Sequence, residues 1–168
     1  MEVALPDPSL VILCGPAGCG KSTFARRHFI ESGVVSSDRC RALLADDERE
    51  IRVSAAAFAL FRQIIDSRLR FRRLTVADST ALHPDARREL RRIARHWTAP
   101  TALLAFDIPE ETCLAWNARR GRRVAPAVIH RQRLRLQEAL RRVPEEGYDQ
   151  VIVLGPDDVG HVSVRISR

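Results

Sequence analysis

The sequence predicts an α/β fold in which helices cover both faces of a central parallel sheet of about five strands. Short apolar runs alternate along the chain with longer segments of helical periodicity. The apolar runs are almost continuously hydrophobic, as expected for strands that are buried on both faces of a parallel sheet. The first run leads into a glycine-rich loop at residues 15–22, the place that such loops take between a strand and a helix.

Five apolar runs are the predicted strands, at residues 10–14, 34–37, 74–78, 101–108 and 151–155. Helices are predicted between them from apolar side chains at spacings of three and four, from prolines in a first turn, or from acidic residues near a start. They cover residues 21–29, 53–72, 84–97, 109–120 and 126–143, with a further helix following the second strand. The tail at residues 157–167 fits either a short helix or an extra edge strand.

The composition is that of an ordinary globular domain, with a net charge of +7. Such a charge suits a phosphate-rich partner such as nucleic acid, although a coding preference for arginine explains it equally well. The four cysteines show no paired spacing, which predicts reduced thiols in a cytoplasmic protein. Neither a signal peptide nor an apolar run of the roughly 18 residues that span a membrane is apparent.

The glycine-rich loop fits the pattern GxxxxGK[ST] in full. Glycines let the backbone turn tightly and direct its N–H groups at phosphate oxygens. Lys21 is the only lysine in the chain, and it is expected to reach the β- and γ-phosphates, while the Ser22 hydroxyl binds magnesium. The pattern therefore predicts ATP and Mg²⁺ as cofactors. The residues predicted to bind the nucleotide here are Gly15, Pro16, Ala17, Gly18, Cys19, Gly20, Lys21, Ser22 and Thr23.

Two aspartates follow predicted strands at the sheet edge that also carries the glycine-rich loop. Asp38 can take the proton of an acceptor hydroxyl during phosphoryl transfer, or it can cap the next helix. Arg41, one turn on, can bind an acceptor phosphate or be an ordinary surface arginine. Asp78 can orient magnesium or its waters, or it can cap a turn.

Four arginines occur together at the end of the helix predicted over residues 109–120 and just after it. They are Arg119, Arg120, Arg122 and Arg123. Such a cluster can close over ATP phosphates as a mobile lid and stabilise charge on the transferring phosphoryl group, or it can complement the helix dipole. We predict a single domain over residues 1–168 with a lid at about residues 109–143.

Several stretches together resemble the kinase domain of bacterial polynucleotide kinase-phosphatase, an end-healing RNA repair enzyme. They are "GPAGCGKSTFARRHF", "VVSSDRCRALLADDE", "AAFALF", "LTVADST" and "IPEETC…N…R". The resemblance covers nearly the whole chain and implies a P-loop kinase-like fold with a helical lid. It implies an ATP- and magnesium-dependent kinase that phosphorylates 5′-OH ends of RNA or DNA. Known members continue into phosphatase and ligase-like domains, so such domains or proteins are the partners it implies.

The resemblance also implies roles for single residues. Asp38 is the general base that activates the 5′-OH, and Arg41 contacts the phosphate next to the accepting nucleoside. Arg120 is a catalytic lid arginine on the ATP phosphates, and Arg123 is a further one. Lys21 acts on the same phosphates as a catalytic residue of the loop.

Two departures from the family concern the predicted nucleotide site. Trp116 stands where the family's lid helix carries an arginine, so Arg119, Arg122 or Arg123 should compensate, or ATP turnover is weaker. Cys19 stands where a small residue is usual, and its thiol is expected to be reactive beside the loop lysine. Two other functions remain open: a P-loop kinase for a small-molecule hydroxyl acceptor, and a nucleotide-binding module without transfer activity.

Overall fold

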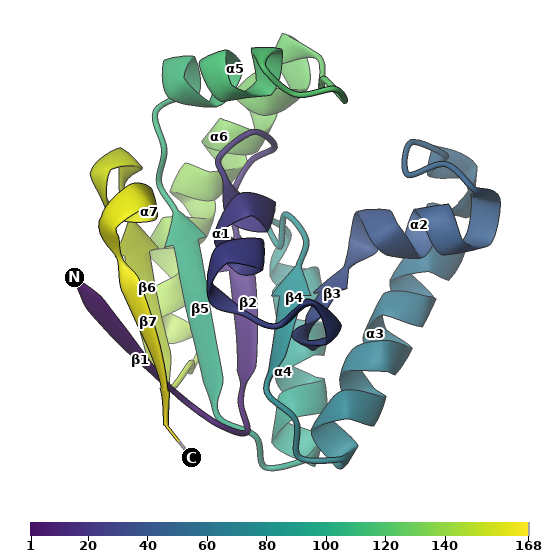
Figure 1. Cartoon of the computed structure of the whole chain (residues 1–168), viewed down its shortest axis with the longest axis vertical. Coiled ribbons are helices and arrows are strands. Elements are labelled where there is room, and N and C mark those ends of the chain that lie inside the picture. Colours follow the sequence, from purple (N-terminus) through teal and green to yellow (C-terminus); the bar gives the residue numbers. More distant parts are fainter. Residues whose placement is uncertain (168) are drawn as a thin grey trace.

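The computed structural model describes residues 1–167, and its centre is a five-stranded parallel sheet (Figure 1). The strand order is β3-β4-β2-β5-β6. The strands are β2 (Leu10–Cys14), β3 (Val34–Ser36), β4 (Thr75–Asp78), β5 (Thr101–Phe106) and β6 (Gln150–Leu154). This confirms the predicted α/β class, and each predicted strand forms within two residues of its expected ends.

Seven α-helices surround the strands in the described part of the chain. They are α1 (Lys21–His28), α2 (Ser37–Ala45), α3 (Ser54–Arg70), α4 (Pro84–His96), α5 (Glu110–Ala118), α6 (Pro126–Arg142) and α7 (Pro156–His161). Three short 3-10 turns, η1 (Glu31–Gly33), η2 (Ile51–Val53) and η3 (Val143–Glu145), join them. The fifth helix ends two residues before its predicted end, so the arginine cluster lies in the loop 119–125.

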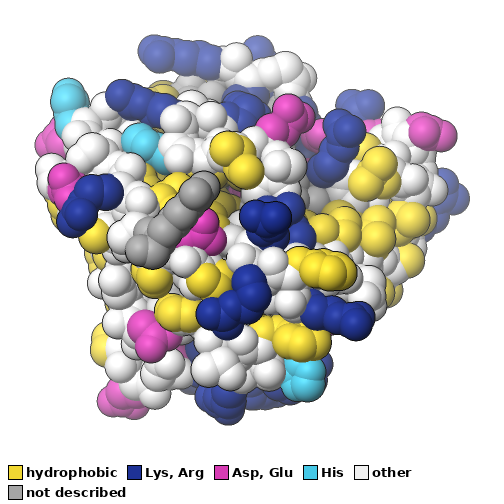
Figure 2. Space-filling view, turned by 60° about the horizontal axis from the view of Figure 1, so that its bottom comes forward, with side chains coloured by type: hydrophobic (Ala, Val, Ile, Leu, Met, Phe, Trp, Pro, Cys, Tyr) yellow, Lys and Arg dark blue, Asp and Glu magenta, His cyan; other side chains and the backbone are white. Residues whose placement is uncertain are grey.

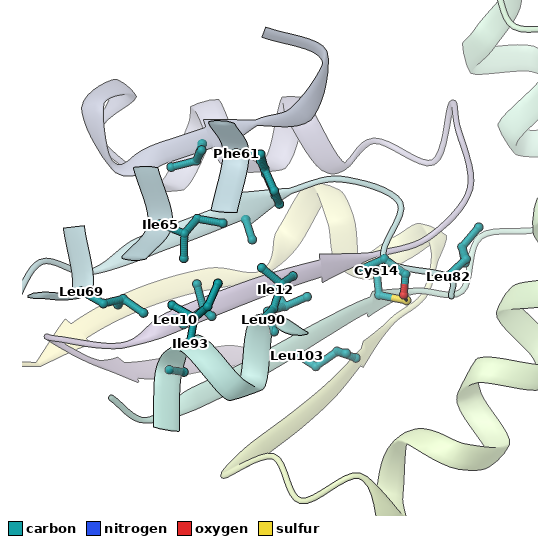
Figure 3. Close-up of a cluster of buried hydrophobic side chains, with 14 of the residues drawn as sticks. Leu10, Ile12, Cys14, Phe61, Ile65, Leu69, Leu82, Leu90, Ile93 and Leu103 are labelled. Atoms are coloured by element: carbon teal, nitrogen blue, oxygen red, sulfur yellow. The ribbon is translucent and has the colours of Figure 1, made fainter. Parts of the chain in front are cut away.

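Two hydrophobic clusters, one on each face of the sheet, hold these layers together. In the first, Leu10 and Ile12 of β2 pack with Ile65 of α3 and Ile93 of α4 (Figure 3). The second cluster packs α1 and α5 against the opposite face, with Phe24 buried at its centre. Every residue of β2, β4 and β5 is buried, which explains why the sequence shows these strands as continuous apolar runs.

The two ends of the described chain form a second, smaller sheet that the sequence did not predict. Strand β1 (Glu2–Pro6) pairs in parallel with β7 (Ser163–Ser167). Val3 and Leu5 of β1 are buried in the second cluster, whereas Ala4 between them is exposed. The tail therefore forms both of the elements that its sequence allowed, first the short helix α7 and then a strand.

The basic side chains are spread over the surface seen in Figure 2 and alternate there with acidic and apolar groups. Much of the excess charge therefore lies outside the nucleotide loop. No helix within residues 1–167 is both long enough and apolar enough to cross a membrane.

A buried ion pair ties α4 to the segment after α6. Arg87 is 0% exposed, and its guanidinium donates to the Glu146 carboxylate at 2.5 and 2.9 Å. The same guanidinium donates to the carbonyl oxygens of Ala81 and Leu82, at 2.9 Å each. Burial by itself would raise the pKa of Glu146, but the hydrogen bonds and charge of Arg87 outweigh it and lower that pKa.

We predict that Arg87→Met lowers the free energy of unfolding by about 3–5 kcal/mol, because it removes the buried guanidinium that binds the Glu146 carboxylate and two carbonyl oxygens. Urea denaturation at pH 7 measures the change. Arg88→Met is the matched control, since its exposed pair with Asp85 is worth about 0–1 kcal/mol. Because the folded state lowers the pKa of Glu146, its stabilisation is present above the ordinary value of about 4.3 and is lost as the pH falls below it. Glu146→Gln should flatten this part of the acid unfolding profile.

Candidate active site

The glycine-rich loop lies between the C-terminal end of β2 and the first turn of α1. Its last residue, Gly20, is the N-cap of α1 in a left-handed conformation with φ 91°. Gly15 N–H donates to the Thr80 carbonyl of the loop after β4, at 2.9 Å. Ala17 N–H donates to Oε1 of Gln132 in α6, at 2.7 Å. The loop is therefore held from both sides, and Gln132 is a contact that the periodicity of an amphipathic helix does not reveal.

Gly18 is the residue of this loop that tolerates a side chain least. Its φ is +80°, and a Cβ built there would lie 2.6 Å from the backbone oxygen of Cys113 in α5. Helix α5 therefore rests directly on the loop backbone, and only a glycine allows this approach.

We predict that Gly18→Ala lowers the free energy of unfolding by about 2–4 kcal/mol, from the left-handed backbone and the overlap with a backbone oxygen. Thermal or urea unfolding measures it. Gly160→Ala serves as the control, because a Cβ at Gly160 meets nothing within 4 Å. Equal stability of the two variants would contradict the close contact between α5 and the loop.

Lys21 is 8% exposed, and its ammonium group lies inside the loop. Nζ donates to the carbonyl oxygens of Gly15 and Pro16, at 2.9 and 2.7 Å. Both of these partners are neutral, so the loop holds a buried positive charge beside backbone N–H groups. This arrangement fits the phosphate groups of a nucleotide, which would supply the negative charge.

Ser22 and Asp78 provide hydroxyl and carboxylate oxygens next to Lys21. Asp78 ends β4 and is 7% exposed. Burial raises the pKa of Asp78, whereas the charge of Lys21 and a hydrogen bond from Ser22 oppose that rise. Such a pair of oxygen donors, one of them carrying charge, fits the preferences of Mg²⁺.

Asp38 does not cap a helix, contrary to one of the two interpretations of its position. Strand β3 ends at Ser36, and the hydroxyl of Ser36 accepts from Arg39 N–H, at 3.2 Å, as the cap of α2. The Asp38 carboxylate instead lies between two guanidinium groups. Oδ1 accepts from Arg41 at 2.6 Å, and Oδ2 accepts from Arg122 at 2.8 Å.

Arg41 is fixed in place and is not an ordinary surface arginine. Its side chain is 15% exposed, and its Nε donates to Ser54 Oγ at 3.2 Å. The guanidinium also lies 5.7 Å from the centre of the Phe58 ring, a cation–π contact. Contacts from α2 and α3 thus set the position of this cation beside the carboxylate.

Of the four clustered arginines, Arg122 is the one that the structure brings to Asp38. It lies in the loop 119–125 and also contacts Glu48, at 3.4 Å. Arg120 and Arg123 are exposed, so their predicted contact with ATP phosphates stays a prediction. The lid loop is closed by Asn117, whose side chain donates to the Val124 carbonyl at 2.8 Å and accepts from Val124 N–H at 2.9 Å.

Cys19 lies at the base of the loop and is 0% exposed. Its Sγ is 3.5 Å from Lys21 Nζ. Burial raises the pKa of the Cys19 thiol, an effect that the charge of Lys21 only partly opposes. A buried thiol that stays protonated is a poor nucleophile, so the structure argues against the reactivity predicted from the sequence.

Solved structures of kinases share this fold. A candidate kinase from Chloroflexus aurantiacus J-10-fl has a TM-score of 0.65 at 16% identity, over 89% of this chain and 85% of that one. A chain of the Pnkp1/Rnl/Hen1 RNA repair complex has a TM-score of 0.66 at 23% identity, over 82% of this chain and 47% of that one. A gluconokinase from Sinorhizobium meliloti 1021 has a TM-score of 0.55 at 17% identity, over 90% of this chain and 84% of that one. At such low identities the similarity shows only that the fold is shared.

No curated protein matches the sequence of this chain. The family model described as "AAA domain" matches residues 10–144, a span that runs from the first residue of β2 to η3 and includes the glycine-rich loop, Asp38 and the loop 119–125. The chain therefore belongs to the AAA domain family.

Proposed function

We propose that the protein is an ATP-dependent polynucleotide 5′-hydroxyl kinase, which transfers the γ-phosphate of ATP to 5′-OH ends of RNA or DNA. One observation carries this proposal. A carboxylate and a fixed arginine, Asp38 and Arg41, lie 2.6 Å apart at the sheet edge that also carries a nucleotide-binding loop. A polynucleotide end offers both a hydroxyl for the carboxylate and a phosphodiester for the arginine.

The chemistry follows from these positions. Asp38 accepts the proton of the 5′-OH while the new O–P bond forms at the γ-phosphorus and the bond to the β–γ bridging oxygen breaks, releasing ADP. Lys21 stabilises charge on the β- and γ-phosphates. Magnesium, for which Ser22 and Asp78 supply suitable oxygens, would neutralise further charge on the phosphates when bound.

The two guanidiniums at Asp38 also suit a phosphorylated acceptor. Arg41 and Arg122 share the Asp38 carboxylate, and Arg122 also contacts Glu48. When Asp38 turns to the hydroxyl, a phosphodiester can replace it as the partner of Arg41 in a charge-assisted contact. In the absence of substrate the same contacts hold the carboxylate in one orientation.

The likeness to a chain of the Pnkp1/Rnl/Hen1 RNA repair complex supports nucleic-acid end healing as the process. Phosphatase and ligase-like domains or proteins are then the expected partners, because a ligase consumes the 5′-phosphate that such a kinase makes. This chain spans about half of that relative.

Incubation with γ-labelled ATP, magnesium and a 5′-OH oligonucleotide tests the proposal. We expect label at the 5′ end of RNA or DNA, and none on an oligonucleotide that already carries a 5′-phosphate. A folded protein that binds ATP but labels neither oligonucleotide would refute the polynucleotide assignment.

A kinase for a small hydroxyl acceptor is the second candidate, and the similarity to a gluconokinase over 84% of its chain favours it. The same loop and carboxylate would serve, because only the acceptor pocket differs. A phosphate-binding arginine beside the base has no ligand in an unphosphorylated alcohol, so Arg41 discriminates between the two.

We predict that Arg41→Ala lowers kcat/KM for a 5′-OH oligonucleotide by roughly 10- to 150-fold, as expected for one charge-assisted hydrogen bond. ATP hydrolysis without acceptor should change far less. Arg39→Ala, at an exposed position of the same helix, is the control and should leave both rates unchanged. If both activities fall equally in Arg41→Ala, a small acceptor becomes the better assignment.

A further inference from the structure

The sheet order determines the side of the loop on which the base of the nucleotide lies. In phosphoryl transfer the attacking oxygen and the leaving oxygen are roughly in line on opposite sides of the γ-phosphorus. Asp38 and Arg41 follow β3, which is two strands to one side of β2. The leaving ADP must therefore extend to the other side, over β5 and β6. There α5 and α7 lie, away from α2 (Figure 1).

Apolar side chains from those two helices meet at the end of the loop. A Cβ built at Gly20 would lie 3.4 Å from the ring carbon Cζ3 of Trp116 in α5 and 3.4 Å from Cγ1 of Val159 in α7. Both side chains are partly buried against the second hydrophobic cluster. An uncharged indole with a free part of its surface thus lies beside the last glycine of the nucleotide loop.

We propose that Trp116, supported by Val159, is the surface on which the base of ATP stacks. The inference rests on the proposed function, because the in-line geometry sets the direction of the nucleoside. An indole cannot neutralise phosphate charge, but its flat face stacks on any nucleobase. Trp116, which stands where the resembled family has a lid arginine for the ATP phosphates, would then bind the base of ATP instead.

The test compares ATP with inorganic tripolyphosphate, which has the phosphates and lacks the nucleoside. Dissociation constants for both, with magnesium, are measured for the wild type, Trp116→Leu and Trp116→Phe. We expect Trp116→Leu to weaken ATP binding by roughly 5- to 150-fold, the range of one base–aromatic stack. Tripolyphosphate binding should stay within about twofold, because no phosphate contact is removed. Trp116→Phe should retain most of the ATP affinity.

Fluorescence provides a second measurement that does not remove the indole. The chain has two tryptophans. Trp97 packs against the first hydrophobic cluster, and its indole N–H donates to Asp66 of α3 at 2.9 Å. In a Trp97→Phe variant Trp116 is the sole tryptophan. ATP should quench its emission strongly, and saturating tripolyphosphate should not.

Three results would overturn the inference. They are equal weakening of both ligands in Trp116→Leu, unchanged affinity for ATP, and equal quenching by both ligands. If Trp116→Leu leaves the ATP affinity unchanged and the protein phosphorylates a 5′-OH oligonucleotide, the stacking site is refuted and the proposed function stands.

If Trp116→Leu selectively loses ATP binding but the wild type transfers no phosphate, the stacking site stands and the proposed function is refuted. If the wild type binds neither ATP nor tripolyphosphate, both are refuted.

Discussion

Asp38→Asn should slow phosphoryl transfer by on the order of 10²–10⁴-fold, the usual contribution of a positioned general base. The amide keeps the size of the carboxylate and can still accept from Arg41 or Arg122, so the variant removes mainly the proton acceptor. The affinity for ATP should be unchanged, because Asp38 lies on the acceptor side of the loop. Turnover of γ-labelled ATP with a 5′-OH oligonucleotide measures the rate, and equilibrium binding measures the affinity.

The matched control is Asp47→Asn, which removes a carboxylate in the same region of the chain. Asp47 accepts from Arg49 N–H at 2.9 Å and from Arg49 Nε at 3.1 Å, with no contact to Arg41 or Arg122 in the described structure. A loss below about tenfold in Asp38→Asn would contradict its role as base. ATP binding without transfer, equal in wild type and variant, would identify a nucleotide-binding module.

Lys21→Arg should be nearly as harmful as Lys21→Ala, with kcat/KM lower by on the order of 10²–10³-fold in both. The Lys21 ammonium is 8% exposed and lies between two backbone oxygens at 2.7 and 2.9 Å. A planar guanidinium is broader and would displace the loop backbone, so conserving the charge does not conserve the contact. Steady-state kinetics of the two variants measures this.

The control is the converse exchange at the surface, Arg92→Lys, where the side chain is 68% exposed and pairs with Glu89. Activity there should match the wild type, since either cation serves on a solvated helix. Activity of Lys21→Arg within tenfold of the wild type would show that the loop accepts the larger group. The single lysine in an arginine-rich chain would then have no chemical reason.

The centre of the larger sheet was predictable because β2, β4 and β5 are buried on both faces, and burial of that kind appears as continuous apolar runs. Strand β1 was missed for the opposite reason. Only Val3 and Leu5 of its first five residues are buried, and its partner β7 lies at the other end of the chain. The tail by itself allowed an edge strand, but neither segment carries a local signal that the two would pair across such a separation.

The position of Asp38 at the sheet edge followed from the rule that parallel strands end on the same side. The sequence did not predict the N-cap residue of α2, because Ser36, Ser37 and Asp38 are all good N-cap residues. The register of β3 decided it, since pairing with β4 ends at Ser36.

The sequence by itself determined the class of fold, the nucleotide loop and the carboxylate next to it, because strand burial, helix periodicity and the loop motif are local patterns. Only the tertiary structure decided that Arg122 is the arginine that reaches Asp38, that Gln132 holds the loop, and that Trp116 lies beside Gly20. These contacts join segments far apart in the chain. They depend on the order of the strands and on the path of the lid loop, which no local pattern encodes.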